Sequence, residues 1–396
     1  MPATMATVDA ILKEVYGPRI EEQLQNEVVL PRRIERTSEG VSSNVGGKYV
    51  DFPIHIKRNT GIGFRAENGQ LPASGQQGYA EVHVPLRYGY GRVRYTGQLM
   101  ELAKTNTQAF TNAVEAENEG LKNDLAKDSS RIIYGDSTGL IASLTDTATS
   151  ATHTVDNAQW ILEGMLVDVL VRSSGSPTGG LQNATVVSVN YDTNTVTLSA
   201  SWTATVLQGI YRAGDYNLEP SGVGNIVHNV TPLHTLDPAT TPIWAARINA
   251  NGGTPRPLSE GLMIQLCDDI RRQGGITSLI MTSLGVRRSY FSLLVQQRRY
   301  PNTKEFAGGF SGLAFNYGKE IPVVEDVDHP PKKMHFLDED KFRVYRSREW
   351  HWMDEDGSII KWVTDFDAWE AMMRCFYELA TRQRNAHGIL ADIIEG

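Results

Sequence analysis

Residues 48–96 read KYVDFPIHIKRNTGIGFRAENGQLPASGQQGYAEVHVPLRYGYGRVRYT, a run in which two alternating segments flank a polar one. Residues 49–56 and 79–95 alternate between apolar and polar side chains, as β-strands do when one face is covered. The connecting segment, GIGFRAENGQLPASGQQG, is rich in Gly, Gln and Asn and is almost free of large apolar side chains. This stretch therefore predicts a long hairpin with a polar tip.

A hairpin of this length is marginally stable on its own in water, so we expect it to lie across another surface. That surface belongs either to its own chain or to another subunit. The same alternation also fits an ordinary meander within a β-sandwich, and the local pattern leaves this alternative open.

The residues on either side of the hairpin carry helical patterns. Residues 7–25 place apolar side chains at near-helical spacing with a break at a Gly-Pro pair, which predicts two short amphipathic helices. These helices would pack on the rest of the protein or on a neighbouring subunit. A longer helix begins near Thr105, where Gln108 completes a capping box, and stops at Gly135. Its single thin apolar line predicts a spine helix that lies on a sheet and is solvated elsewhere.

Residues 138–217 differ in composition from the rest of the chain. Only eight of these 80 residues are charged and none is lysine, which is about half the charge density of the whole chain. Short Val- and Thr-rich runs separated by turn residues predict a separate small β-barrel or β-sandwich. No cluster of Trp, His and carboxylate side chains in this segment indicates a sugar or metal site.

The remainder of the chain is first α/β and then β-rich in pattern. Two predicted helices and two predicted buried strands follow a Pro-rich connector, at residues 259–272, 278–282, 285–299 and 321–324. Helices and strands in this order build a layered α/β core. The stretch WEAMMRCFYEL, residues 369–379, satisfies both a helical and a strand pattern, so the local pattern does not decide its structure.

Charge and composition exclude several classes of protein. The 38 basic and 46 acidic residues give a net charge of -8, which argues against dominant binding to nucleic-acid phosphates. No unbroken apolar run approaches ~18 residues, so we expect a soluble protein with no membrane association. Cys267 and Cys375 lack disulfide or metal spacing and the N-terminus lacks a secretion signal, so we expect a reducing compartment.

Two motifs of common enzyme sites are missing from the sequence. It contains no GxxxxGK[ST] and no HExxH, and its nine histidines form no i, i+4 pair. The acidic run of Glu325, Asp326 and Asp328 could supply a carboxylate pair, but its place between an apolar strand and two prolines favours a solvated loop. We therefore predict no catalytic residue, no cofactor and no metal site, and we expect that the chain is not an enzyme.

Taken in order, these parts resemble the major capsid protein of tailed bacteriophages, the Hong Kong 97-like fold. The resemblance covers the whole chain except residues 138–217. Besides the hairpin, it is carried by the helix–strand–helix pattern of residues 258–299, FSGL at 310–313, IPVV at 321–324, Asp326 and Asp328 before Pro330, and MHFLD at 334–338.

The resemblance implies an α+β fold with an inserted small all-β domain. It also implies that residues 369–379 form a long strand, with residues 382–390 returning beside it. In the family's terms the chain divides into an N-arm (1–47), an E-loop (48–96), a P-domain with the spine helix (97–137), the inserted β domain (138–217), a connector (218–257), an A-domain (258–345) and C-terminal P-domain strands (346–396).

The function that the resemblance implies is structural. The chain would self-assemble into pentamers and hexamers of an icosahedral shell that encloses the double-stranded DNA of a tailed phage. The implied partners are further copies of the chain, a portal protein, weakly held packaged DNA and, as one option, a decoration protein on the surface-exposed residues 138–217. Because the chain starts almost directly at the arm, we also expect a separate scaffolding protein. Assembly would take place in the cytoplasm of the bacterial host and the product would be the virion.

Three charged residues of the E-loop are candidates for subunit contacts. We expect Arg58, Arg65 and Glu67 to form ion pairs with the P-domain and spine helix of a neighbouring subunit. The tip contains no lysine, so we do not expect the lysine–asparagine crosslink of some family members. Two alternatives stay open: an encapsulin-like compartment, and a secreted β-rich carbohydrate-active protein, for which the sequence lacks both an export signal and an acid pair.

Overall fold

The computed structural model divides the chain into two compact units, which are residues 1–130 with 342–380, and residues 131–341 with 381–396. The residues that it describes are 29–34, 36–37, 49–99, 101, 107–296, 303–305, 311–354 and 357–396. The two helices expected within residues 7–25, and Thr105 of the expected capping box, lie outside the described residues.

The first unit is built on a sheet with a long central strand. Its elements are α2 (Leu30–Arg33), β1 (Arg36–Thr37), β2 (Tyr49–Lys57), β3 (Gly78–Pro85), β4 (Arg87–Thr96), most of α4 (Thr107–Ile132), β17 (Phe342–Trp352), β18 (Ile360–Trp362) and β19 (Ala368–Thr381). The order β1-β17-β19-β18 is completed by β4, which pairs with β19 from Thr96↔Ala368 to Arg87↔Tyr377. The ambiguous residues 369–379 therefore form a strand, as the resemblance implied.

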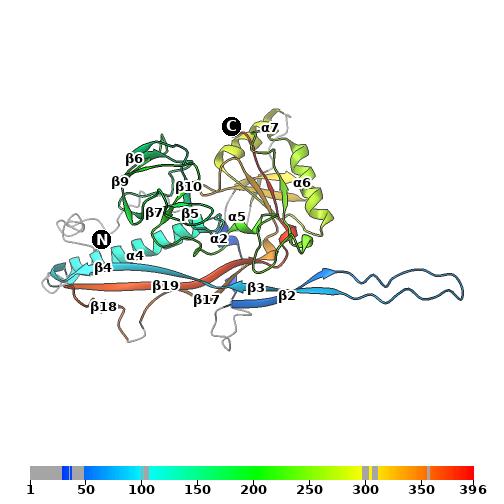
Figure 1. Ribbon diagram of the computed structural model, residues 1–396, viewed down its shortest axis with the longest axis horizontal. Helices are drawn as coiled ribbons and strands as arrows, with labels where there is room; N and C mark the ends of the chain where they lie inside the picture. Colours follow the sequence, from blue (N-terminus) through cyan, green and yellow to red (C-terminus); the bar gives the residue numbers. More distant parts are fainter. Residues whose placement is uncertain are drawn as a thin grey trace. The chain divides into compact units, whose positions relative to one another are not determined.

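Helix α4 lies along one face of this sheet (Figure 1). A Cβ atom on Gly91 of β4 would lie 2.8 Å from Cδ1 of Leu125 and 3.3 Å from Cδ1 of Leu121. The Tyr95 hydroxyl donates a hydrogen bond to Oδ1 of Asn118 at 2.9 Å. Leu121 and Leu125 belong to the thin apolar line of the sequence, so the expected packing of a spine helix on a sheet is confirmed.

Strands β2 and β3 form the predicted hairpin. They pair in antiparallel fashion from Tyr49↔Pro85 to Lys57↔Gly78, with an irregularity in register between His55 and Lys57. Only the base of the hairpin is covered, where Val82 and Val84 are fully buried and Phe52 stacks on Tyr345 of β17 with 6.2 Å between ring centroids. The connection, residues 58–77, continues beyond β2 and β3 as a long narrow loop (Figure 1).

The second unit contains a seven-stranded mixed sheet with the order β11-β20-β16-β12-β15-β14-β13. Its elements are β11 (Arg247–Asn249), α6 (Glu260–Arg272), β12 (Leu279–Thr282), α7 (Leu284–Gln296), β13 (Thr303–Glu305), β14 (Ser311–Asn316), β15 (Glu320–Glu325), β16 (Met334–Leu337) and β20 (Gly388–Leu390). Helix α6 begins at Ser259, whose hydroxyl accepts from the Leu262 N–H at 3.3 Å. Both predicted helices and both predicted strands of this region are confirmed.

The expected return of residues 382–390 beside β19 is wrong. Strand β20 instead lies between β11 and β16, where Gly388 pairs with Phe336 and Leu390 with Met334. The physical reason is that both edges of β19 already have partners, β4 on one edge and β17 and β18 on the other. The apolar run of β20 fits a central strand, which is buried on both faces.

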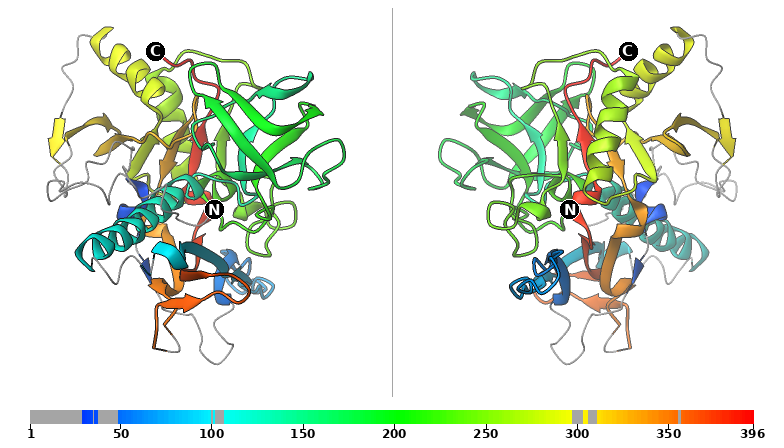
Figure 2. Two further views of the ribbon diagram at one scale, coloured as in Figure 1. Left: turned by 90° about the vertical axis from the view of Figure 1, so that its left-hand side faces the viewer. Right: turned by 90° about the vertical axis from the view of Figure 1, so that its right-hand side faces the viewer.

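Residues 140–212 form a small closed β-barrel. Its strands are β5 (Leu140–Ser143), β6 (Thr149–Thr154), β7 (Leu166–Val171), β8 (Ala184–Asn190), β9 (Thr195–Thr203) and β10 (Gln208–Arg212), in the order β5-β10-β7-β8-β9-β6. A bridge between Leu144 and Val155 joins the two ends of this order, and the strands curve around one apolar core that includes Trp202 and Ile210 (Figure 2). Of the two predicted architectures, the barrel is the one formed.

Candidate functional site

The connection between β2 and β3 is held by its own backbone. The Gly69 N–H donates to the Ala66 carbonyl at 2.9 Å, which closes a turn at the tip. Arg65 fixes the two sides of this turn, because its Nε donates to the Gln70 carbonyl at 2.8 Å and a terminal nitrogen donates to the Phe64 carbonyl at 2.9 Å. The tip is therefore a defined surface that can be presented to a partner.

Three large apolar side chains stand out from this tip. Ile62 is 84% exposed, Phe64 101% and Leu71 82%. The composition of the connection predicted a polar tip and gave no sign of a role for these three side chains, although their isolation among glycines and amides was the available signal. Covering each of them would stabilise a contact by up to about 1.5 to 3 kcal/mol, which is a strong driving force for docking on another surface.

The charged residues expected to contact a neighbour all lie on this connection. Arg58, Arg65 and Glu67 are exposed. Within the described part of the chain, none of the three forms an ion pair, and only Arg65 makes side-chain hydrogen bonds, both within the tip. The structure thus places the three residues on one connection, and the intersubunit ion pairs stay a prediction.

A second exposed surface lies on the sheet of the first unit, on the face opposite α4. Tyr88 and Tyr90 of β4 are 53% and 66% exposed, and Tyr88 packs edge-on against Phe376 of β19. Arg374 lies over the Phe376 ring at 5.8 Å, and Glu370 pairs with Arg94 at 3.6 Å. Strand registers set this surface, because residues paired across β4 and β19 point to the same side.

The two aspartates of the acidic run, which follow β15, are buried, so the expectation of a solvated loop is wrong. Asp326 is 2% and Asp328 5% exposed. The Tyr134 hydroxyl donates to Asp326 Oδ2 at 2.8 Å, and the Asp328 N–H donates to Asp326 Oδ1 at 3.0 Å. Burial, together with the Asp326 carboxylate, raises the pKa of Tyr134. Tyr134 follows α4 in the sequence, and local pattern could not show that the fold brings it to this turn.

Three buried histidines lie near the same region. His329 Nδ1 is 2.9 Å from the Pro330 carbonyl, which can only accept, so the proton of His329 is on Nδ1. His335 Nδ1 then donates to His329 Nε2 at 2.7 Å. The third, His387, has Nε2 at 2.8 Å from the Thr381 hydroxyl. Burial lowers the pKa of His329 and of His387 to about 3 and also lowers the pKa of His335.

These histidines make stability depend on pH in a stated direction. Between pH 6.5 and about 3, each of these histidines binds a proton in the unfolded state but not in the folded state. Their contribution to the free energy of unfolding is therefore fully present above pH 6.5 and is lost as the pH falls below 6.5. His329 and His387 should each lower the free energy of unfolding by about 1.4 kcal/mol per pH unit in this window.

Denaturant unfolding at pH 7, 6 and 5 measures this slope. His387→Gln should reduce the slope by about 1.4 kcal/mol per pH unit, the contribution of one proton. A free energy of unfolding that stays constant from pH 7 to pH 5 would contradict the lowered pKa values of His329 and His387.

Metal and membrane sites were also sought. Among the described residues, no three His, Cys, Asp or Glu side chains are placed to hold a metal ion. In the same part of the chain, no helix is long and apolar enough to cross a membrane. The exposed tip and the aromatic sheet face are two surfaces that the described residues offer to partners.

The comparison with protein families shows which kind of protein carries these surfaces. A family sequence model described as SU10 major capsid protein matches residues 172–393, more than half of the chain. The chain belongs to the SU10 major capsid protein family. This capsid protein is therefore a structural subunit that self-assembles into a shell, and its place is the capsid of a virion.

Solved structures agree with the family. The capsid protein is similar to a chain of the cyanophage A-1(L) capsid asymmetric unit, with a TM-score of 0.55, 15% identity, and coverage of 97% of this chain and 99% of that chain. The Hong Kong 97-like α+β fold is thereby confirmed. A structure from Mycobacterium phage Bobi has a lower TM-score of 0.48, with 8% identity and coverage of 99% of each chain. The holo-SrpI encapsulin complex from Synechococcus elongatus PCC 7942 has a TM-score of 0.47, with 7% identity and coverage of 100% of this chain and 96% of that chain. No curated protein sequence matches the capsid protein.

Proposed function

We propose that this capsid protein assembles as pentamers and hexamers of a closed icosahedral shell around the double-stranded DNA of a tailed phage, and that the β2–β3 connection contacts a neighbouring subunit. The observation that carries the proposal is the exposure of Ile62, Phe64 and Leu71 on a tip that its own hydrogen bonds hold in shape. A monomer gains nothing from three uncovered apolar side chains, whereas a repeating assembly covers them in every copy.

We further propose the division of the chain into family domains. Residues 48–96 act as the E-loop after an N-arm (1–47), and residues 97–137 with 346–380 form the P-domain. Residues 258–345 form the A-domain after the connector (218–257), and residues 381–396 join its sheet because β20 pairs with β11 and β16. Residues 138–217 act as an inserted domain on the shell surface, supported by a barrel with a core of its own.

The proposed partners follow from a shell of this family. They are a separate scaffolding protein, a portal protein, packaged DNA in weak non-specific contact, and a decoration protein that binds the barrel. We place assembly in the cytoplasm of the bacterial host and assign no catalytic role to the chain. The acidic balance of 46 carboxylates against 38 basic residues supports weak contact with DNA, since phosphates are repelled by net negative charge.

Microscopy of the purified chain tests this proposal. The chain is expressed alone and with candidate scaffolding genes from the same source, then examined by negative-stain microscopy and light scattering. Closed shells, or rings of five and six subunits, are expected. A monomer under every condition would overturn the proposal, and closed shells that carry protein cargo without DNA would replace it with an encapsulin-like compartment.

Phe64 at the tip should be important for assembly but not for folding. Phe64→Asp is expected to reduce assembly yield at least tenfold, about 1.4 kcal/mol per contact, because it puts a charge where an apolar side chain is to be buried. Its unfolding midpoint as a monomer should equal that of the wild type, since Phe64 is 101% exposed. Leu207→Asp, at a 65% exposed barrel position, is the control and should assemble normally. Normal assembly of Phe64→Asp would remove the tip from the contact.

Arg65 should act both on the shape of the tip and on its charge. Arg65→Glu removes two hydrogen bonds within the tip and reverses its charge, so assembly yield is expected to fall severalfold. Arg58→Glu and Glu67→Lys reverse charges without removing any described hydrogen bond, so they measure the electrostatic contribution to assembly yield separately from the shape of the tip. Particle yield and the salt concentration that dissociates particles measure the effect. Wild-type yield and salt resistance in all three variants would show that these charges make no intersubunit contact.

A further inference from the structure

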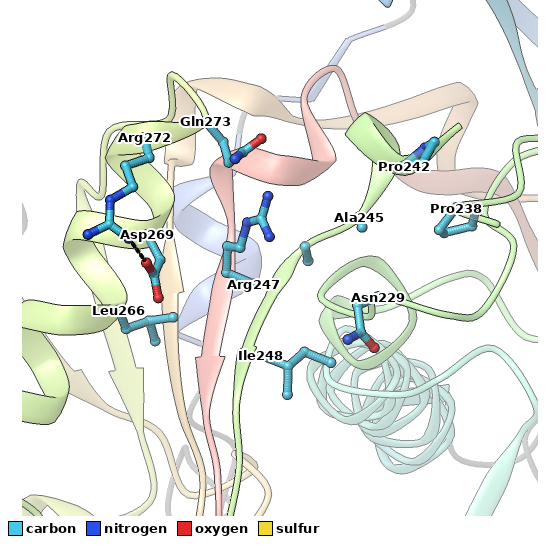
Figure 3. Close-up of a pocket in the computed structure, with 11 residues that line it drawn as sticks. Asn229, Pro238, Pro242, Ala245, Arg247, Ile248, Leu266, Asp269, Arg272 and Gln273 are labelled. Carbon is cyan, nitrogen blue, oxygen red and sulfur yellow. Dashed lines mark hydrogen bonds and ion pairs between the residues drawn. The ribbon is translucent and has the colours of Figure 1, made fainter. Parts of the chain in front are cut away.

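A cavity of about 500 Å³ opens on the second unit beside α6. It lies between α6 and the segment that runs from residue 229 to β11 (Figure 3). Pro238, Pro242, Ile248 and Leu266 form the apolar part of its wall. Its polar side chains are Asn229, Arg247, Asp269, Arg272 and Gln273.

Arg247 is the side chain that gives this cavity its chemistry. It projects from β11 into the space between Gln273 and Ala245 (Figure 3). Its guanidinium forms no hydrogen bond and no ion pair within the part of the chain that the structure describes. Among the described residues no carboxylate pairs with Arg247, because Asp269, the one acidic residue of the wall, is bonded to Arg272 at 2.7 Å. A guanidinium that lines a cavity without a protein acceptor favours an acceptor that enters there.

The wall around Arg247 is fixed before any ligand arrives. Strand β11 is paired with β20 in register Arg247↔Gly388, and the Arg247 N–H donates to the His387 carbonyl at 2.9 Å. The opposite wall is held by the buried Arg384, which donates to the Thr231 carbonyl at 2.8 Å and to the Trp244 carbonyl at 3.4 Å. A ligand would therefore meet a preformed site and would not have to order it.

We propose that this cavity binds an oxyanion, a phosphate or carboxylate group, with Arg247 as its principal ligand. A guanidinium offers two parallel N–H groups to such a group, and the Asn229 and Gln273 amides can donate to further oxygen atoms. The oxyanion has two possible sources, a free anion in solution or a carboxylate side chain of a second copy of the chain. The first source is independent of the shell proposed above, and the second rests on it.

Calorimetric titration of the unassembled chain with inorganic phosphate, and separately with acetate, tests the free anion. Saturable binding at one site is expected, and Arg247→Met should weaken it at least tenfold. Arg271→Met is the control. Arg271 is exposed in the last turn of α6, beside the cavity, but does not line it, so this variant should bind the anions as the wild type does. Arg247→Lys keeps the charge without the two parallel donors and should bind with intermediate affinity.

Assembly yield of the same variants tests the second source. If phosphate and acetate do not bind the unassembled wild type, but Arg247→Met and not Arg271→Met lowers assembly yield severalfold, the oxyanion is a carboxylate of a second copy. Should neither anion bind and both variants assemble like the wild type, the proposal is overturned. The titration of the wild type tests anion binding without the need for any variant. If Arg247→Met does not fold, Arg247→Lys takes its place in both experiments.

Discussion

Replacement of Arg384 by methionine is expected to lower the free energy of unfolding by about 3 to 5 kcal/mol. Arg384 is fully buried and pairs with no carboxylate among the described residues. Its guanidinium instead donates to four backbone carbonyls, those of Asn225 at 2.9 Å, Ile226 at 2.9 Å, Thr231 at 2.8 Å and Trp244 at 3.4 Å. Methionine would fill much of the volume but would leave these buried acceptors without donors.

Chemical denaturation followed by tryptophan fluorescence measures this loss. Burial lowers the pKa of Arg384 to about 10, so it stays charged at neutral pH and its four bonds are charge-assisted. Arg384→Lys should recover little, because an ammonium group cannot span carbonyls that the planar guanidinium bridges. Arg58→Met is the control at an exposed site on the β2–β3 connection and should change stability by less than about 0.5 kcal/mol. Equal stability of Arg384→Met and Arg58→Met would show that the carbonyls find other donors.

Replacement of Glu219 by alanine is expected to cost about 3 to 5 kcal/mol for a different reason. Glu219 and Arg131 are 7% and 6% exposed and form a two-pronged ion pair, in which one N–O distance is 3.3 Å. Arg131 lies at the end of α4 and Glu219 follows the last barrel strand, so the pair joins the two ends of the barrel segment. Alanine would leave a buried guanidinium without its carboxylate.

A double variant separates the charge of this pair from its packing. Arg131→Met combined with Glu219→Leu should be more stable than Glu219→Ala alone, because no buried charge is left behind. Glu163→Ala, at an exposed barrel position, is the control and should be neutral. If Glu219→Ala unfolds at the same denaturant concentration as Glu163→Ala, the ion pair contributes nothing to stability.

Much of the fold could be predicted because its elements bury one face. The hairpin, the thin stripe of α4 and the strands of the second unit all carry the period of their structure in the sequence. Residues 369–379 could not be assigned locally, since WEAMMRCFYEL as a whole satisfies both periods, and only pairing with β4 decides for a strand. The prediction that residues 388–390 pair with β19 was wrong for a related reason. A short apolar run fits a strand but does not specify which sheet that strand joins.

The candidate site was less predictable than the fold. Arg58, Arg65 and Glu67 were chosen by their place in the connection, and their contacts stay a prediction, because exposed charges carry no pattern that identifies a partner. Phe64 was overlooked because a single apolar residue among glycines does not change a composition-based judgement of polarity. Asp326 was judged solvated, because its burial depends on Tyr134, which lies 192 positions earlier in the chain.

The most direct test of the central claim is a cryo-electron microscopy map of assembled particles that resolves residues 58–77. We predict that Ile62, Phe64 and Leu71 of each copy lie against the surface of a neighbouring copy and are no longer exposed. A map in which these three side chains face solvent, or rest only on their own subunit, would contradict the claim that this connection joins the subunits of the shell.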